Sequence, residues 1–240
     1  MTKKKQDKFE KQDEQLQEVN NALTGAGQWI EKHSKALTIG VTVIVLVILG
    51  IFAYKQFVIE PRHRAATKEN GENYFALIEY YQHTANAAGL SQEEIDALTS
   101  ELEEAANGFA STANKFDNQE GKFAALCAGA TYAQMGLYEE AAANLEKFSA
   151  EDMHFQAAAK QLLGDCYSEL GEYDAAIDAY LAAARTGNEV FAPASLKKAG
   201  IAYLKIEDKE GAHEAFKTLK ESYPASVEAQ DVDKFIALTE

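Results

Sequence analysis

Residues 164–183 read GDCYSELGEYDAAIDAYLAA, and two further versions of this stretch occur in the chain. They are GATYAQMGLYEEAAANLEKF at 129–148 and GIAYLKIEDKEGAHEAFKTL at 200–219. Each copy starts with Gly and has Tyr three residues later, Ala twelve later and a large apolar residue sixteen later. The copies start 35 and 36 residues apart. A fixed period of this length predicts a stack of repeated helical units.

Each copy predicts two packed helices joined by a short turn. Alanine is abundant, Gly and Pro punctuate the segments, and no stretch alternates with a period of two residues. We expect the Gly of the first helix to lie opposite the Ala of the second, and the large residue to fill the space to the next pair. The turns are predicted at Gly136-Leu137-Tyr138 and Gly171-Glu172-Tyr173, whereas Glu207-Asp208 replaces the Gly in the third copy.

This order of small and aromatic residues resembles the tetratricopeptide repeat, whose period is about 34 residues. Tyr223-Pro224 ends the third copy where such repeats carry a closing Pro. The resemblance implies three helix pairs over residues 119–225. Upstream, residues 69–118 look like a degenerate helical hairpin with Ala105 and Phe109 in the small and aromatic places. Downstream, residues 226–240 predict a capping helix, from Ser226 to Leu238, that hides the apolar face of the last pair.

An uncharged apolar run, ALTIGVTVIVLVILGIFAY, occupies the nineteen residues from Ala36 to Tyr54. As a helix it measures about 28 Å, close to the hydrocarbon thickness of a bilayer. A secretory signal core is shorter and ends at a small-x-small cleavage site. The run therefore predicts a transmembrane helix over 36–58, between a charged arm at 1–35, partly disordered or an amphipathic helix, and a basic juxtamembrane linker at 59–68. The fold class expected is all-α, with this helix followed by a tetratricopeptide-like helical-repeat solenoid.

Charge is unevenly distributed along the chain. Residues 69–240 hold 31 acidic and 12 basic residues, a net charge of −19 within a chain of net charge −15. Such a surface repels nucleic-acid backbones and anionic lipid head groups, so we expect no nucleic-acid partner. It suits basic partners, although a merely solvated acidic surface has the same composition.

The charges beside the apolar run leave its orientation open. Four basic residues between Lys55 and Lys68 follow the run, against Lys32 and Lys35 just before it, which locally favours a cytoplasmic C-terminal domain. The whole N-terminal arm holds seven Lys, which favours the opposite orientation.

The sequence shows no catalytic or metal-binding pattern. Five His residues are dispersed, and HExxH, GxSxG, DxDxDG and a phosphate-binding Gly loop are absent. Cys127 and Cys166 form neither CxxC nor a zinc spacing, which leaves two buried thiols or one disulfide. We therefore expect no enzyme, no cofactor, no metal and no small-molecule substrate.

Stacked helix pairs line a groove with their first helices. Positions three and six before each repeat Gly, and one, four and five after it, are expected to face this groove. The candidate protein-binding residues are Phe123, Leu126, Gln134, Gln161, Asp165, Glu169, Lys197, Ile201 and Lys205. The set has apolar ends and an acidic middle, which suits a segment with apolar and basic character. The alternative is that these positions only pack against neighbouring helices of the same chain.

Residues 28–66 read QWIEKHSKALTIGVTVIVLVILGIFAYKQFVIEPRHRAA, with an aromatic–acidic–Lys lead-in to the apolar run and an aromatic, basic stretch after it. Together with the repeats, this resembles the ancillary subunit family of the bacterial SecYEG translocon, although the charged arm is longer here. The resemblance implies a single-pass inner-membrane protein whose periplasmic domain contacts translocon subunits and envelope chaperones, without catalysis. The function expected is thus a membrane-tethered protein-binding adaptor. The alternative is a structural scaffold subunit of another envelope complex that binds no client.

Overall fold

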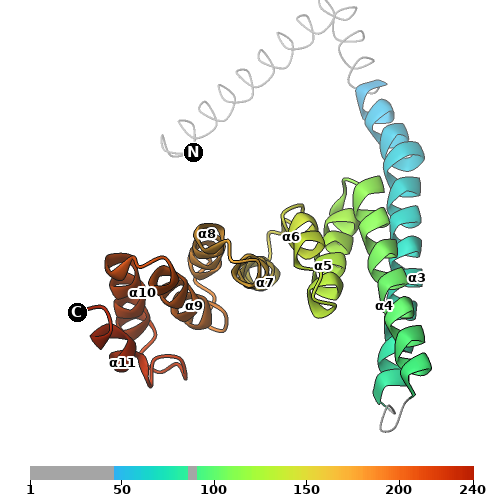
Figure 1. The fold of residues 1–240 in the computed structure, drawn as a ribbon. Coiled ribbons are helices and arrows are strands. Elements are labelled where there is room, and N and C mark those ends of the chain that lie inside the picture. Colours follow the sequence, from blue (N-terminus) through green and yellow to red (C-terminus); the bar gives the residue numbers. More distant parts are fainter. Residues whose placement is uncertain (1–45, 86–90) are drawn as a thin grey trace, which may run out of the picture. The chain divides into compact units, whose positions relative to one another are not determined.

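Helices form all the regular structure in the described parts of the chain, residues 46–85 and 91–240 of a computed structural model. Their order is η1 (Lys55–Ile59), α3 (Glu60–Ala85), α4 (Gln92–Lys115), α5 (Gln119–Gln134), α6 (Tyr138–Leu145), α7 (Met153–Glu169), α8 (Tyr173–Ala184), α9 (Ala192–Lys205), α10 (Lys209–Ser222) and α11 (Val232–Ala237) (Figure 1). The expected all-α fold is therefore confirmed for these residues. The chain divides into two units, Met1–Pro61 and Arg62–Glu240, and each is described by itself.

The described part of the first unit is an apolar helical segment with exposed side chains. Residues 46–54 are helical and η1, a π-helix, follows. The large apolar side chains from Leu46 to Ile59 are between 38% and 78% exposed. The predicted arm, 1–35, and the first ten residues of the predicted span, 36–45, lie outside the described residues. Within the described residues, no helix has both the length and the apolar character that a membrane crossing requires.

The basic stretch at 59–68, predicted to be a linker, is helical, because η1 ends at Ile59 and α3 begins at Glu60. Pro61 favours a linker in the sequence, since Pro lacks an N–H donor and clashes with the carbonyl four residues earlier. That carbonyl belongs to Phe57 and lies in η1, where the Glu60 N–H donates to the Lys55 carbonyl five residues back. The wider π-turn gives the Pro ring room, so the helix is not interrupted.

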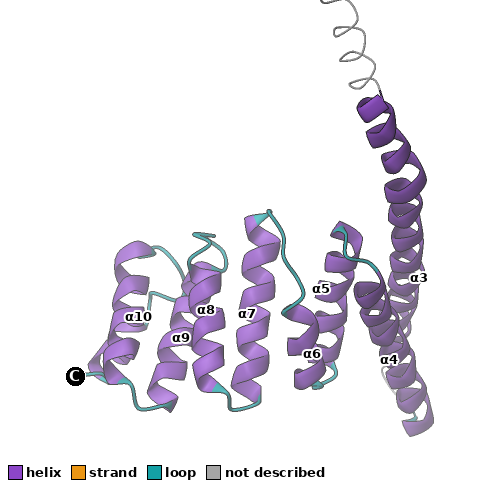
Figure 2. Ribbon diagram, turned by 90° about the horizontal axis from the view of Figure 1, so that it is seen from above, coloured by secondary structure: helices purple, strands orange, loops and turns teal. Residues whose placement is uncertain are grey.

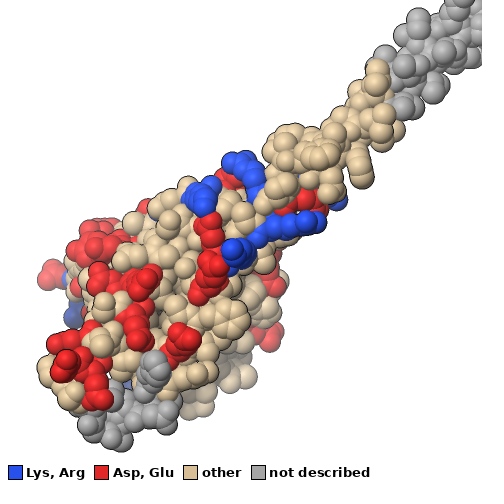
Figure 3. Space-filling view, turned by 90° about the vertical axis from the view of Figure 1, so that its right-hand side faces the viewer, with Lys and Arg blue, Asp and Glu red and all other residues tan. Residues whose placement is uncertain are grey.

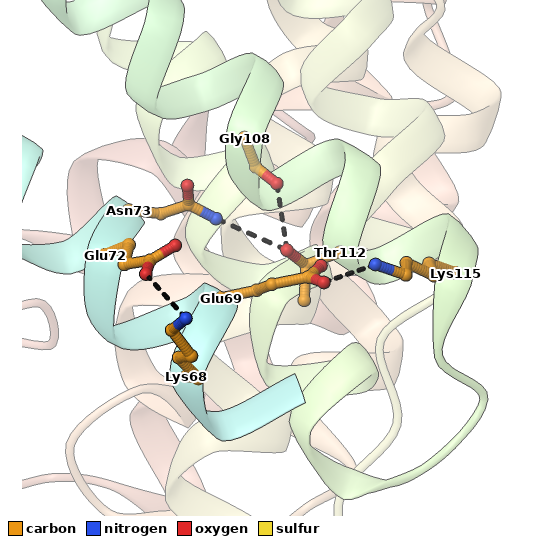
Figure 4. A network of polar contacts seen from close by, with 7 residues as sticks. All are labelled: Lys68, Glu69, Glu72, Asn73, Gly108, Thr112 and Lys115. Carbon is orange, nitrogen blue, oxygen red and sulfur yellow. Dashed lines mark hydrogen bonds and ion pairs between the residues drawn. The ribbon is translucent and has the colours of Figure 1, made fainter. Parts of the chain in front are cut away.

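The first helices of the second unit, α3 and α4, pack through polar side chains (Figure 4). The buried Thr112 hydroxyl donates to the Gly108 carbonyl at 3.0 Å and accepts from the Asn73 amide at 3.3 Å. Glu69 and Lys115 form an ion pair at the same interface. A Cβ at Gly108 would lie 2.2 Å from the Asn73 Oδ1, so a larger residue here would displace the Asn73 amide that binds Thr112. In this hairpin the small residue at the close contact is on the second helix.

Side-chain caps determine where α4 and α5 begin. Ser91 and Glu94 form a capping box at the start of α4, which lowers the pKa of the Glu94 carboxyl through the Ser91 N–H. The Asn118 side chain accepts from the Gly121 N–H at the start of α5. Between these ends, Ala105 and Phe109 are 1% and 0% exposed, which places both in the core.

Three helix pairs follow, α5 with α6, α7 with α8 and α9 with α10, and they stand side by side in Figure 2. In each pair the large side chain of the second helix lies on the repeat Gly of the first. An added Cβ would come within 2.5 Å of that side chain at Gly129 (Leu145), Gly164 (Tyr180) and Gly200 (Phe216). The closest contact of the repeat Gly is therefore with the large residue and not with the Ala that was predicted opposite it. The large residue also packs toward the next pair, as predicted, because Tyr180 shares a buried cluster with Ala199 and Ala202 of α9. Because the repeat Gly has no side chain, the large residue of the second helix can pack directly on the backbone of the first helix at this position.

The buried core of the described residues consists of three neighbouring clusters. The first joins helices α4 to α7 around Phe109, Tyr132 and Leu145. The second lies between α8 and α9 around Tyr180, and the third joins α9, α10 and α11 around Phe216. Each cluster is shared by helices that are close in sequence, as expected for a repeat protein.

The turn within each pair is the same Schellman motif, including the one without Gly. The residue with positive φ is Gly136 (75°), Gly171 (77°) or Glu207 (62°). The N–H of the next residue donates to the carbonyl of the repeat Tyr, at 2.9, 2.8 and 3.0 Å respectively. Glu207 thus adopts a left-handed backbone conformation that favours Gly.

The capping helix is shorter than the predicted Ser226–Leu238, since α11 covers only Val232–Ala237. Residues 226–231 form successive turns, in which the Ala229 N–H donates to the Ser226 carbonyl. Val227, an apolar residue within the predicted helix, is 74% exposed.

An ion-pair network accompanies the turns that replace the first half of that helix. They bring Asp231 to Lys197 of α9 and to Lys234, each at 2.7 Å. Hydrogen bonds from these two ammonium groups lower the pKa of the Asp231 carboxyl to about 2. Val232 is then buried and Phe235 stacks on Phe216 with ring centroids 5.2 Å apart, so the segment covers the last pair.

The contact at Gly164 can be tested by adding one methyl group. Gly164→Ala should lower the free energy of unfolding by about 1–3 kcal/mol, because the new Cβ overlaps the Tyr180 ring. Gly71→Ala is the control, since open space surrounds Gly71 in α3 and the change should stabilise by about 0.5–1 kcal/mol. Urea unfolding of the full chain, followed by circular dichroism, measures both. Equal stability of Gly164→Ala and the wild-type chain would contradict the contact.

The strained turn can be tested by a reciprocal pair of substitutions. Glu207→Gly should raise the free energy of unfolding by about 0.5–1 kcal/mol, because Gly tolerates the positive φ. Gly171→Ala, at a φ of 77° in the second copy, should lower it by about 1 kcal/mol. The same unfolding measurement distinguishes them, and a destabilised Glu207→Gly chain would show that Glu207 makes a contact worth more than the strain.

Candidate protein-interaction surface

The first helices of successive pairs contact one another through polar side chains. The Ser195 hydroxyl of α9 donates to the Gln161 side chain of α7 at 3.0 Å. Lys198 of α9 donates to both carboxylate oxygens of Asp165 in α7, each at 2.7 Å. These contacts hold α7 and α9 in register, so side chains at equivalent repeat positions lie in a row.

A groove of about 690 Å³ lies between the first and second pairs. Six of its lining residues occupy the repeat positions one, four and five after the Gly, and they are Ala130, Ala133, Gln134, Asp165, Ser168 and Glu169. The remaining walls include Tyr138, Leu162, Tyr180 and Lys198. The groove therefore has an apolar floor of small residues and a polar rim.

The other candidate binding residues lie outside this groove. Phe123 is 44% exposed and lines a separate cleft, whereas Leu126 packs against the first core cluster. Lys197 pairs with Asp231, with its ammonium 5.2 Å from the centre of the Phe235 ring. Ile201 and Lys205 are exposed on α9. The structure thus brings Gln134, Asp165 and Glu169 together, and it places Phe123, Leu126, Gln161, Lys197, Ile201 and Lys205 elsewhere.

The acidic middle of the predicted groove is partly neutralised by the chain itself. Asp165 binds Lys198 and also accepts a hydrogen bond from the Tyr180 hydroxyl at 2.7 Å. Burial and this carboxylate raise the pKa of Tyr180, so the phenol stays protonated and donates. Glu169 is exposed at the rim. The carboxylate available to a partner is therefore Glu169 rather than Asp165.

Two groove residues missed by the sequence analysis share one repeat position. Leu162 and Lys198 both lie two residues before their repeat Gly, a position not included in the expected set. Because a helical turn is 3.6 residues, this position is close to the face of the residue at plus one. The recurrence of the position in the aligned copies is the signal that could have found both residues.

The α3–α4 hairpin contacts the groove on the side formed by α5. The Tyr81 hydroxyl of α3 donates to the Gln134 side chain of α5. For Gln134, Gln161 and Lys197, packing within the same chain is therefore part of their role. A partner in the groove would meet Gln134 already held in place.

The cysteines carry no reactive chemistry in this state. Cys127 and Cys166 are both free thiols, and Cys166 is buried beneath the groove. Burial raises the pKa of each thiol to about 11, so both are protonated at neutral pH and poor nucleophiles. Among the residues the structure describes, no group of three or more His, Cys, Asp or Glu side chains is placed to hold a metal ion.

On the face drawn in Figure 3, acidic side chains are more widespread than basic ones. Asp and Glu side chains spread widely over this face, and Lys and Arg side chains gather in one area. This distribution agrees with the net charge of −19 carried by residues 69–240.

The fold and the groove define a tetratricopeptide-like helical-repeat protein. No family model matches the chain, and no curated protein matches it. Two solved crystal structures of MamA are similar, both with a TM-score of 0.47. One is 23% identical over 62% of this chain and 83% of that chain, and the other is 24% identical over 61% and 75%. A likeness of this degree identifies neither a family nor a function.

Proposed function

We propose that this chain is a membrane-tethered protein-binding adaptor that acts beside the SecYEG translocon. The observation that carries the proposal is the convergence of three equivalent repeat positions, from each of the first two copies, on one groove between the first two helix pairs. A row of side chains presented by rigid helices is the usual binding surface of helical-repeat proteins. The residues offered to a partner are a small apolar floor at Ala130 and Ala133 and the carboxylate of Glu169.

The membrane part of the proposal rests on the apolar run. Between Leu46 and Ile59, ten large apolar side chains are at least 38% exposed. Exposed apolar surface of this density is stable when another apolar phase covers it, and the run from Ala36 to Tyr54 has the length of a bilayer-spanning helix. The inner membrane of a bacterium is the proposed location, with the C-terminal domain in the periplasm.

The translocon and the envelope chaperones are proposed as partners on the likeness of residues 28–66 to the ancillary translocon subunits. The groove adds a chemical requirement. A segment with apolar side chains and a Lys or Arg would fit its floor and pair with Glu169.

Groove variants of the full chain test the adaptor function. Ala133→Trp fills the floor and should reduce recovery of translocon subunits and chaperones by about tenfold, since a steric block removes the central contact. Glu169→Lys should reduce recovery by about threefold at low salt and less at high salt. Glu139→Lys, on the exposed surface of α6, is the matched control and should leave recovery unchanged.

The measurement is copurification in mild detergent followed by quantitative mass spectrometry. Equal recovery with all three variants would contradict a role for the groove. A fixed set of other envelope subunits, recovered at constant stoichiometry, would instead support the scaffold function.

The proposed topology has its own test. Protease added to intact spheroplasts should digest residues 69–240, because a periplasmic domain is accessible from outside. A cytoplasmic domain would survive until the cells are lysed, and that result would contradict the topology. A soluble cytoplasmic protein of the same cells serves as the control for intact membranes.

A further inference from the structure

A second hollow, distinct from the groove, contains three phenylalanine rings. Phe123 from α5, Phe148 after α6 and Phe155 from α7 line a cleft of about 840 Å³, which we call the aromatic cleft. Phe123 and Phe155 are 44% and 52% exposed. Exposed rings that share one hollow form a surface that water covers poorly.

The repeat pattern does not account for the Phe123 ring. Phe123 lies six residues before its repeat Gly, where the other copies have Ala158 and Ala194. Both alanines are more than half-shielded from water within their pairs, so a helix pair is built without an aromatic side chain at this position. The large ring in the first copy is therefore not a requirement of repeat packing.

Carboxylates surround the aromatic cleft. Glu120, Glu151 and Asp152 line it, against Lys122 as the single Lys or Arg in its lining. Asp152 is fixed in position, because it accepts from the backbone N–H groups of His154 and Phe155 at 2.8 and 3.2 Å. Glu120 accepts from His63 at 2.8 Å, so the exposed Glu151 is the rim carboxylate most available to a partner. The rim thus favours positive charge next to an apolar centre.

We propose that the aromatic cleft binds a large apolar side chain of a partner polypeptide, flanked by Lys or Arg residues. This inference rests on the proposed protein-binding function, and it specifies the chemistry of one partner side chain that would enter the cleft. A buried aromatic or aliphatic anchor in a pocket is the common centre of a protein interface, and complementary rim charges orient it.

The charges select this occupant over others. An anionic lipid would bring its phosphate against a lining in which Glu120, Glu151 and Asp152 outnumber Lys122 and in which Glu151 is exposed. A second copy of this chain would bring another domain of net charge −19. A basic and apolar segment is attracted by the same rim, and it gains the apolar area of the rings.

Defined peptides test the proposal on the full chain held in nanodiscs of zwitterionic lipid, which does not attract Lys-rich probes. The probes are short fluorescein-labelled peptides in which one Phe or Trp stands between pairs of Lys, in a Gly/Ser background. Fluorescence anisotropy gives Kd. Replacing the aromatic by Ser, or the Lys by Glu, should weaken binding at least about tenfold.

Matched variants locate the peptide. Phe123→Ser with Phe155→Ser should weaken binding at least about tenfold, and Phe155→Ser alone by a smaller factor. Phe75→Ser is the control, because Phe75 is 68% exposed on α3 outside the cleft. Glu151→Lys should weaken binding, whereas Glu104→Lys on the exposed face of α4 should not. Circular dichroism of each variant verifies that the helices are retained.

Two results would contradict the proposal that the aromatic cleft binds the peptide. One is unchanged affinity in the doubly substituted chain with its helices intact. The other is loss of peptide binding in Ala133→Trp, which would place the peptide in the groove and leave the adaptor function standing. Retention of peptide binding by Ala133→Trp, together with loss in the Phe variants, supports a separate anchor site.

Discussion

The contact between a glycine backbone and a large side chain inside each helix pair is the constraint on which the rest of the structure depends. With no Cβ at Gly164, the Tyr180 ring lies directly on the helix, and Leu145 and Phe216 do the same in the other pairs. This fixes the depth and register at which the paired helices meet. Because the register is repeated, the first helices of successive pairs align, and residues at the same repeat position gather on one side. The groove is a consequence of that spacing.

Much of the fold could be predicted from spacing along the chain. The three copies predicted the helix pairs, and Gly136 and Gly171 predicted the turns within the first two pairs. The structure shows that both Gly residues, and Glu207 in the third pair, have positive φ. Local patterns were less informative where another segment decides the conformation. Residues 226–231 have helical periodicity, but they form turns, and Asp231 at their end binds Lys197 from a different helix. Pro61 marks a break in most helices, yet a π-turn before it accommodates the ring.

The groove was predictable in part for the same reason. Gln134, Asp165 and Glu169 were found because they follow the repeat Gly at fixed intervals, and the helix carries those intervals to one face. The partner of Asp165 was not found, since Lys198 lies 33 residues away and only the stacking of α7 on α9 brings it close. Pairing of this kind decides which charge in a repeat surface is available to a ligand. Composition alone overestimates the acidity of such a site.

The division of the core into three clusters has a mechanical consequence. Each cluster ties together only helices that are neighbours along the chain. Tension applied between the two ends of the repeat region would therefore be resisted link by link, and the α10–α11 end could peel away while the α4–α7 cluster keeps its buried side chains. Under a stretching force, a repeat domain of this kind should unfold in several steps, one cluster after another, and not cooperatively at a single force.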